Sequence, residues 1–123
     1  MIGTVGFRDL EVSCVIGVNP QERIAEQRLL VDLSLEYDFA PSLASHRVED
    51  VLHYGEVARA LTDHLRGNRY GLLESAAAGL LESLVKEFPA LVRATVELRK
   101  PAAMAGRAVP YVRLEWSEKR AVS

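Results

Sequence analysis

Apolar and polar side chains alternate along four segments of the chain, and between the second and third segments the spacing becomes helical. Strict alternation is typical of a strand with one buried and one solvated face, whereas apolar residues three and four positions apart indicate an amphipathic helix. The pattern therefore predicts the order strand, strand, helix, helix, strand, strand. The strands are expected at residues 3–16, 27–38, 91–100 and 109–116, with helices from about Tyr54 to Gly67 and Asn68 and from about Leu72 to Pro89.

The segments between these elements contain residues that interrupt regular structure. Asp9 breaks the alternation of the first strand, so we expect a bend or bulge between Arg8 and Leu10. Residues 17–23 contain asparagine and proline, which predict a turn-rich loop. Residues 40–52 contain proline and scattered charges, which predict an irregular connection.

Together the elements predict an α+β domain that extends over residues 1–123. Short connections favour antiparallel pairing into a four-stranded sheet with both helices packed on one face, in the order β-β-α-α-β-β. One face of the second strand stays polar, so we expect no helices on that side. The sheet also has two edges with little protection by proline or lysine. These features predict that several copies associate through their sheets into a ring.

Composition narrows the classes of function. A net charge of −2 gives no electrostatic basis for binding nucleic acid or an anionic membrane surface. No apolar run approaches the length of a transmembrane helix, and the amino terminus lacks a signal-peptide pattern. The one cysteine, Cys14, cannot form an internal disulfide, which predicts a reducing cytoplasmic location. His46, His53 and His64 are too few and too scattered to predict a zinc site.

Lys100 occupies an unusual position in the pattern. Val96 and Leu98 share one face of the third strand, and continued alternation places Lys100 on that apolar face, just before Pro101. A lysine there either extends past the edge of the core into water or lies in a pocket where it has a chemical role. General acid or base chemistry is one such role, because desolvation lowers the pKa of an amine toward the working pH. The strand pattern alone leaves both interpretations open.

Three further polar residues lie where predicted elements begin or end. Glu22 follows the first strand, Tyr54 begins the first helix and Glu74 lies in the first turn of the second helix. Position alone allows simple structural interpretations: a solvated loop carboxylate, a tyrosine packed against the sheet, and a glutamate that stabilises a helix start through the macrodipole. The motifs in which these residues occur suggest instead that each has a role in a functional site.

Short motifs occur along the chain in a defined order. They are Ile16-Gly17-Val18, Pro20-Gln21-Glu22-Arg23 with Gln27, Val31-Asp32-Leu33, residues 50–57, Leu72-Leu73-Glu74, Phe88-Pro89 and Lys100-Pro101. In this order and at this spacing the chain resembles the dihydroneopterin aldolases over nearly its full length. The resemblance implies the tunnelling fold of that family, in which the sheets of several subunits close into an oligomeric β-barrel ring.

The resemblance also implies a reaction in folate biosynthesis, the retro-aldol cleavage of 7,8-dihydroneopterin into 6-hydroxymethyl-7,8-dihydropterin and glycolaldehyde. Such enzymes use no metal, no cofactor and no lysine Schiff base, because the ring imine of the pterin accepts the electrons. By resemblance, Lys100 is the general acid/base for the side-chain hydroxyl and Tyr54 is the proton donor to the enol-like intermediate. Glu22 is implied as the group that orients the trihydroxypropyl chain.

Substrate binding and assembly follow from the same resemblance. Glu74 is implied to present two acceptors to the N–H donors of the pterin, while Leu73, Leu52 and Val51 line the substrate site together with Glu22. Val51 departs from the family, many of whose members have a small polar residue next to the pterin. The resemblance implies a homo-oligomer, a tetrameric ring or an octamer, with the tyrosine of each site supplied by a neighbouring subunit.

Alternatives remain open on the sequence alone. The same residues would serve a 2′-epimerase of 7,8-dihydroneopterin, and for the triphosphate of that compound Arg23, Arg99 and Arg107 are available as cations. A metal-dependent enzyme of the same fold, such as a pyruvoyl-tetrahydropterin synthase, is disfavoured by the scattered histidines. The non-enzymatic alternative is a pterin-binding oligomeric scaffold.

Overall fold

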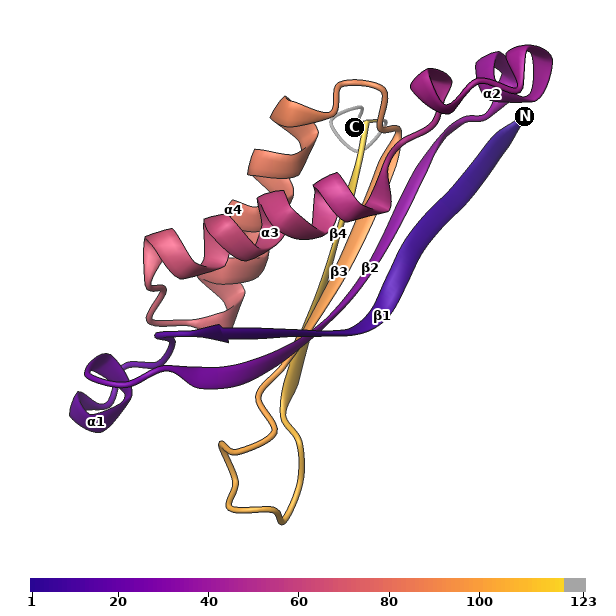
Figure 1. Ribbon diagram of the computed structural model, residues 1–123. Coiled ribbons are helices and arrows are strands. Elements are labelled where there is room, and N and C mark those ends of the chain that lie inside the picture. Colours follow the sequence, from indigo (N-terminus) through magenta and orange to yellow (C-terminus); the bar gives the residue numbers. More distant parts are fainter. Residues whose placement is uncertain (119–123) are drawn as a thin grey trace.

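The computed structural model describes residues 1–118 and has an antiparallel four-stranded sheet in the order β1-β2-β3-β4. Two long helices follow each other between β2 and β3, and both cover the same face of the sheet (Figure 1). This is the predicted α+β arrangement. The bounds are β1 Ile2–Cys14, β2 Gln27–Asp38, α3 Tyr54–Asn68, α4 Leu73–Glu87, β3 Arg93–Arg99 and β4 Tyr111–Ser117.

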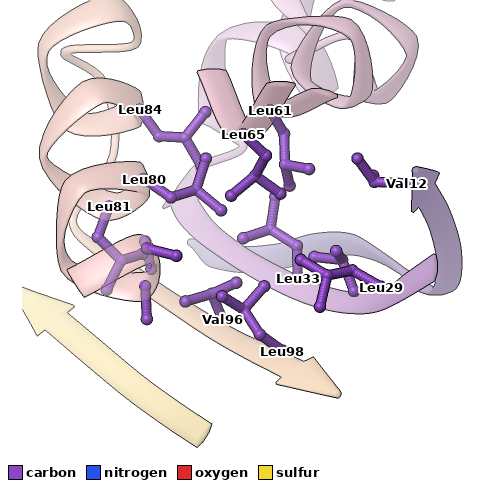
Figure 2. Packing of buried hydrophobic residues seen from close by; sticks show 14 of the residues in the cluster. Val12, Leu29, Leu33, Leu61, Leu65, Leu80, Leu81, Leu84, Val96 and Leu98 are labelled. Atoms are coloured by element: carbon purple, nitrogen blue, oxygen red, sulfur yellow. The ribbon is translucent and has the colours of Figure 1, made fainter. Parts of the chain in front are cut away.

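The core lies between the sheet and these helices. The alternation predicted for β2 is confirmed, because its odd-numbered apolar residues are buried from Leu29 to Leu35. Side chains of β3, α3 and α4 point into the same layer (Figure 2). Fully buried residues that meet there are Leu29, Val31, Leu33, Leu61, Leu65, Leu80, Leu84, Val96 and Leu98.

Two stretches predicted to be irregular contain short helices, so those predictions were wrong in detail. The loop after β1 holds α1 (Pro20–Arg23), and the connection after β2 holds α2 (Ala40–Ser45) and a 3₁₀ turn (Val48–Asp50). Proline lies in the first turn of both α1 and α2, where its missing N–H has no helical partner to lose. The same proline that stops a strand can therefore start a helix.

The predicted bulge in β1 is confirmed. The β1–β2 register shifts between Phe7 and Leu10, and Asp9 has a left-handed φ of 61°. The Asp9 N–H donates to Asp32 Oδ1 at 2.8 Å, and Arg99 Nη2 donates to Asp9 Oδ1 at 2.7 Å, so side chains of β2 and β3 hold the bulge in place. β1 bends sharply about halfway along its length (Figure 1), as expected for a bulged strand.

Both edges of the sheet lack a partner strand within residues 1–118, because β1 pairs only with β2 and β4 pairs only with β3. Free edges of this kind are templates for pairing with another chain. The ring stays a prediction, and the free edges of the sheet are compatible with it. Among residues 1–118, no helix combines the length and the hydrophobicity that crossing a bilayer requires.

Shortening a side chain in the shared core should destabilise the fold. Leu80 lies on α4 with 0% exposure, and Leu80→Ala should lower the free energy of unfolding by about 2–5 kcal/mol, because it removes buried surface and leaves a cavity. Glu82→Ala, an exposed change on the same helix, should stay within about 0.5 kcal/mol of the unmodified protein. Denaturant titrations measure the free energy of unfolding, and an equal decrease for the two variants would contradict the burial of Leu80 in the core.

Candidate active site

Lys100 and Glu22 form an ion pair at the end of the sheet from which the β3–β4 connection leaves. Lys100 Nζ lies 2.9 Å from Glu22 Oε2, and the two side chains are only 13% and 20% exposed. Lys100 follows the last residue of β3, and its N–H donates to Pro110 O at 3.1 Å, which fixes the backbone at this point. Of the two interpretations of Lys100, the structure supports a lysine held in a pocket.

The loop after β1 holds Glu22 in place. Gly17 is buried with φ +123°, and a Cβ at this position would collide with the Glu22 carboxylate, so only glycine allows this approach. Gln27 Nε2 donates to Glu22 Oε2 at 3.1 Å and to Ile16 O at 2.6 Å. The amide side chain at the start of β2 thus fixes the carboxylate that faces Lys100.

These contacts lower the pKa of Glu22. The hydrogen bond from Lys100 is the main cause, followed by the bond from Gln27, and the N–H of Asn19 adds a smaller contribution. Burial acts in the opposite direction but does not outweigh them. The pair stabilises the fold above the usual glutamate pKa, and this contribution is lost as the pH falls through the lowered value.

A cleft of about 260 Å³ lies beside this ion pair and extends to the start of α4. Glu74, in the first turn of α4, lines it with an exposed side chain that has no hydrogen-bond or ion-pair partner within residues 1–118. The N-terminal end of a helix favours a negative charge there. Apolar walls complete the cleft: Val18, Leu72, Leu73, Ala103 and Pro110.

The structure does not bring the other predicted residues to this cleft. Val51, Leu52 and Tyr54 line a separate hollow of about 510 Å³ at the start of α3. Tyr54 is 66% exposed there. The 15 residues of α3 separate Tyr54 from the turn that precedes Glu74, a span of about 20 Å at 1.5 Å per residue. Figure 1 shows α3 running from the end of the chain segment after α2 to this turn.

Of the three arginines considered as phosphate ligands, two are bonded to the protein itself, and Arg107 is an exposed residue of the β3–β4 connection. Arg23 donates to the carbonyl oxygens of Gly17, Arg69 and Tyr70. Arg99 pairs with Asp9, Asp32 and Glu97 across the polar face of the sheet. Among residues 1–118, Lys100 is the one cationic side chain that lines the cleft.

Sequence reasoning gave Gln27 and Arg23 no role in shaping the site. The available signals were the position of Arg23 next to Glu22, in a loop whose carbonyl groups need donors, and the place of Gln27 in the same motif as Glu22. Within residues 1–118, the structure has no group of three or more His, Cys, Asp and Glu side chains that could hold a metal ion.

A model of the dihydroneopterin aldolase family matches residues 5–117. The chain belongs to this family. It is 33% identical to the dihydroneopterin aldolase of Escherichia coli over 102 residues, which cover 82% of each chain. It is also 33% identical over 100 residues to a dihydroneopterin triphosphate 2′-epimerase of Pseudomonas aeruginosa, covering 81% of this chain and 80% of that one.

A solved structure agrees with the sequence comparison. The crystal structure of the E. coli dihydroneopterin aldolase in complex with neopterin has a TM-score of 0.86 at 30% identity and covers 94% of this chain and 99% of that one. These comparisons confirm three predictions: the family, its fold and an enzyme of the lyase class. The epimerase among the relatives matches the alternative that the sequence left open.

Removing the charge of Lys100 should reverse the lowering of the Glu22 pKa. In Lys100→Met the pKa of Glu22 should rise toward its usual value, because the largest cause of its lowering is gone. Carbon NMR titration of the carboxyl group measures this. Lys86→Met is the matched control, since Lys86 is an exposed lysine in the last turn of α4, and it should leave the Glu22 pKa unchanged. An unchanged value in both variants would contradict the ion pair.

Proposed function

We propose that this family member cleaves 7,8-dihydroneopterin into 6-hydroxymethyl-7,8-dihydropterin and glycolaldehyde. The observation that carries the proposal is the 2.9 Å contact between Lys100 and Glu22, beside a cleft that Glu74 also lines; within residues 1–118 the Glu74 carboxylate has no hydrogen-bond or ion-pair partner. A base near an orienting carboxylate, with a separate anchor for the heterocycle, matches what a retro-aldol cleavage of this substrate requires. The neopterin bound to the E. coli relative supports the choice of ligand.

Glu74 is the proposed anchor for the pterin. A carboxylate offers two oxygens to the adjacent N–H donors of a 2-amino-4-oxopterin, which gives a bidentate, charge-assisted contact. Leu72 and Leu73 directly precede Glu74 and supply apolar surface for the flat ring. The trihydroxypropyl chain then extends toward Lys100 and Glu22.

Lys100 is the proposed general base. In its neutral amine form it takes up the proton of the 2′-hydroxyl and becomes an ammonium paired with Glu22, while the hydroxyl oxygen becomes the carbonyl oxygen of glycolaldehyde as the C1′–C2′ bond breaks. The bonding electrons pass into the ring imine, so the reaction needs no metal and no other cofactor. Glu22 hydrogen-bonds the hydroxyl groups of the chain and holds Lys100 beside them. When the electrons return, C1′ of the enol-like intermediate takes up one proton and becomes the hydroxymethyl group.

Tyr54 is the proposed donor of that proton, supplied by a second copy of the chain. About 20 Å of helix separates Tyr54 from the Lys100 cleft in its own chain, so a single copy lacks one of the groups that the reaction needs. The outer edges of β1 and β4, which pair with no further strand within residues 1–118, would allow the copies to join into a ring, a tetramer or two stacked rings. Val51 and Leu52 would then meet the pterin from the neighbouring side. We place this assembly in the cytoplasm.

The epimerase remains the second candidate, because it uses the same bond cleavage followed by re-addition of the aldehyde. The cleft favours an unphosphorylated substrate in either case. Lys100 is the one cation in its walls within residues 1–118, while the guanidinium groups of Arg23 and Arg99 already bond to carbonyl and carboxylate oxygens. A triphosphate would depend on Lys100 and on Arg107, the exposed arginine of the β3–β4 connection.

Product analysis after incubation with 7,8-dihydroneopterin tests the reaction. We expect release of glycolaldehyde, and Lys100→Ala should lower kcat by about 10²- to 10⁴-fold while pterin binding persists. Glu74→Ala should instead weaken binding by roughly 10- to 100-fold, since it removes charge-assisted hydrogen bonds.

Lys86→Ala, which removes an exposed lysine far along α4, should match the unmodified enzyme in both assays. Formation of the 2′-epimer without release of glycolaldehyde would show that the protein is an epimerase and not an aldolase. Full turnover in Lys100→Ala would remove the lysine from the mechanism, and pterin binding without any turnover by the unmodified protein would indicate a scaffold.

Complementation tests the shared site. Lys100→Ala and Tyr54→Phe should each be nearly inactive alone, yet a co-expressed mixture should regain part of the activity. In mixed oligomers some sites combine the intact lysine of one copy with the intact tyrosine of its neighbour. No recovery in a mixed oligomer would indicate that each chain supplies its own complete site.

A further inference from the structure

We propose that Arg23 is a positioning residue that fixes the distance between the Lys100–Glu22 pair and the pterin anchor Glu74. This role rests on the proposed function, in which one substrate spans both groups. Arg23 itself is not among the residues that line the cleft, and its guanidinium is bonded to backbone oxygens. It would therefore act through the backbone that carries the site carboxylates.

The guanidinium joins two segments that are distant in sequence. Arg23 Nη1 donates to Gly17 O at 2.9 Å and to Tyr70 O at 3.2 Å, and Nη2 donates to Arg69 O at 2.8 Å. The Gly17 N–H also donates to Tyr70 O at 3.2 Å. One side chain thus ties the loop that carries Glu22 to the turn between α3 and α4.

The turn between α3 and α4 has backbone carbonyl groups that need these donors. Arg69 caps the end of α3 in a left-handed conformation, with φ 49°, and carbonyl groups at a helix C-terminus lack helical partners. A cationic side chain that satisfies them is favoured by the helix dipole. Glu74 lies a few residues beyond this turn, so the position of the turn sets the position of Glu74.

The turn is itself held by both long helices. Tyr70 Oη lies 2.7 Å from His64 Nε2 on α3. On α4, a Cβ at Gly79 would collide with the hydroxyl of Tyr70, so the ring packs directly against the glycine backbone. Arg23 therefore connects the Glu22 loop to a turn that the helices fix, and not to a free loop.

The three bonds depend on the shape of guanidinium. Its planar fork presents several N–H donors in fixed directions, whereas a lysine ammonium is a point charge on a flexible stem. Lysine at position 23 should keep the charge but not all three carbonyl contacts. Arg23→Lys should consequently restore only part of what Arg23→Ala loses.

Two ligands separate positioning from a general loss of structure. Neopterin would contact both Glu74 and the Lys100–Glu22 pair, while pterin without the side chain would contact only Glu74. If Arg23 sets the separation, Arg23→Ala should weaken neopterin binding at least about tenfold more than pterin binding, comparable to losing one charge-assisted hydrogen bond. Isothermal titration measures both Kd values, and Arg23→Lys should give an intermediate difference.

Arg66→Ala is the matched control, since Arg66 is an exposed arginine whose contact is an ion pair with Glu26, and it should leave both Kd values unchanged. Equal weakening of the two ligands by Arg23→Ala, or no weakening of either, would overturn the positioning role. If Arg23→Ala does not fold, the same comparison with Arg23→Lys decides, and equal effects there overturn it. An unmodified protein that binds neither ligand would overturn the proposed function itself, and this role with it.

Discussion

The ion pair between Lys100 and Glu22 is the constraint on which the candidate site depends. It joins the end of β3 to the loop after β1, two segments 78 residues apart in sequence, and keeps both side chains mostly out of solvent. A charge pair in such a place is stable only when further hydrogen bonds satisfy it. Gln27, Asn19 and the glycine at position 17 supply those bonds and the space for them.

The rest of the fold positions this pair and its surroundings. The core between the sheet and the long helices sets where β3 ends and where α4 begins, so Lys100 and Glu74 come to one cleft. On the opposite face of the sheet, Arg99 and the bulge at Asp9 connect three strands next to Lys100. A rigid scaffold of this kind holds catalytic groups at defined distances with little reorganisation when substrate binds.

Hydrophobic periodicity predicted the long elements well, because alternation in β2 and the stripes of α3 and α4 reflect burial directly. It also located the bulge, since Asp9 cannot share the apolar face of β1. It did not predict α1 or α2, which are too short to show a period and depend on local hydrogen bonds. Strand alternation singled out Lys100, and the motif resemblance gave Glu22, Glu74 and Lys100 their expected roles. The bonding of Arg23 required coordinates, because its partners include backbone carbonyls of a distant turn.

A crystal structure of the protein with neopterin tests the central claim most directly. The account predicts the pterin edge on Glu74, the hydroxyl chain beside Lys100 and Glu22, and Tyr54 of a second copy close to the C1′ carbon. A ligand bound elsewhere, or a Lys100 ammonium that points into open water in the complex, would contradict it.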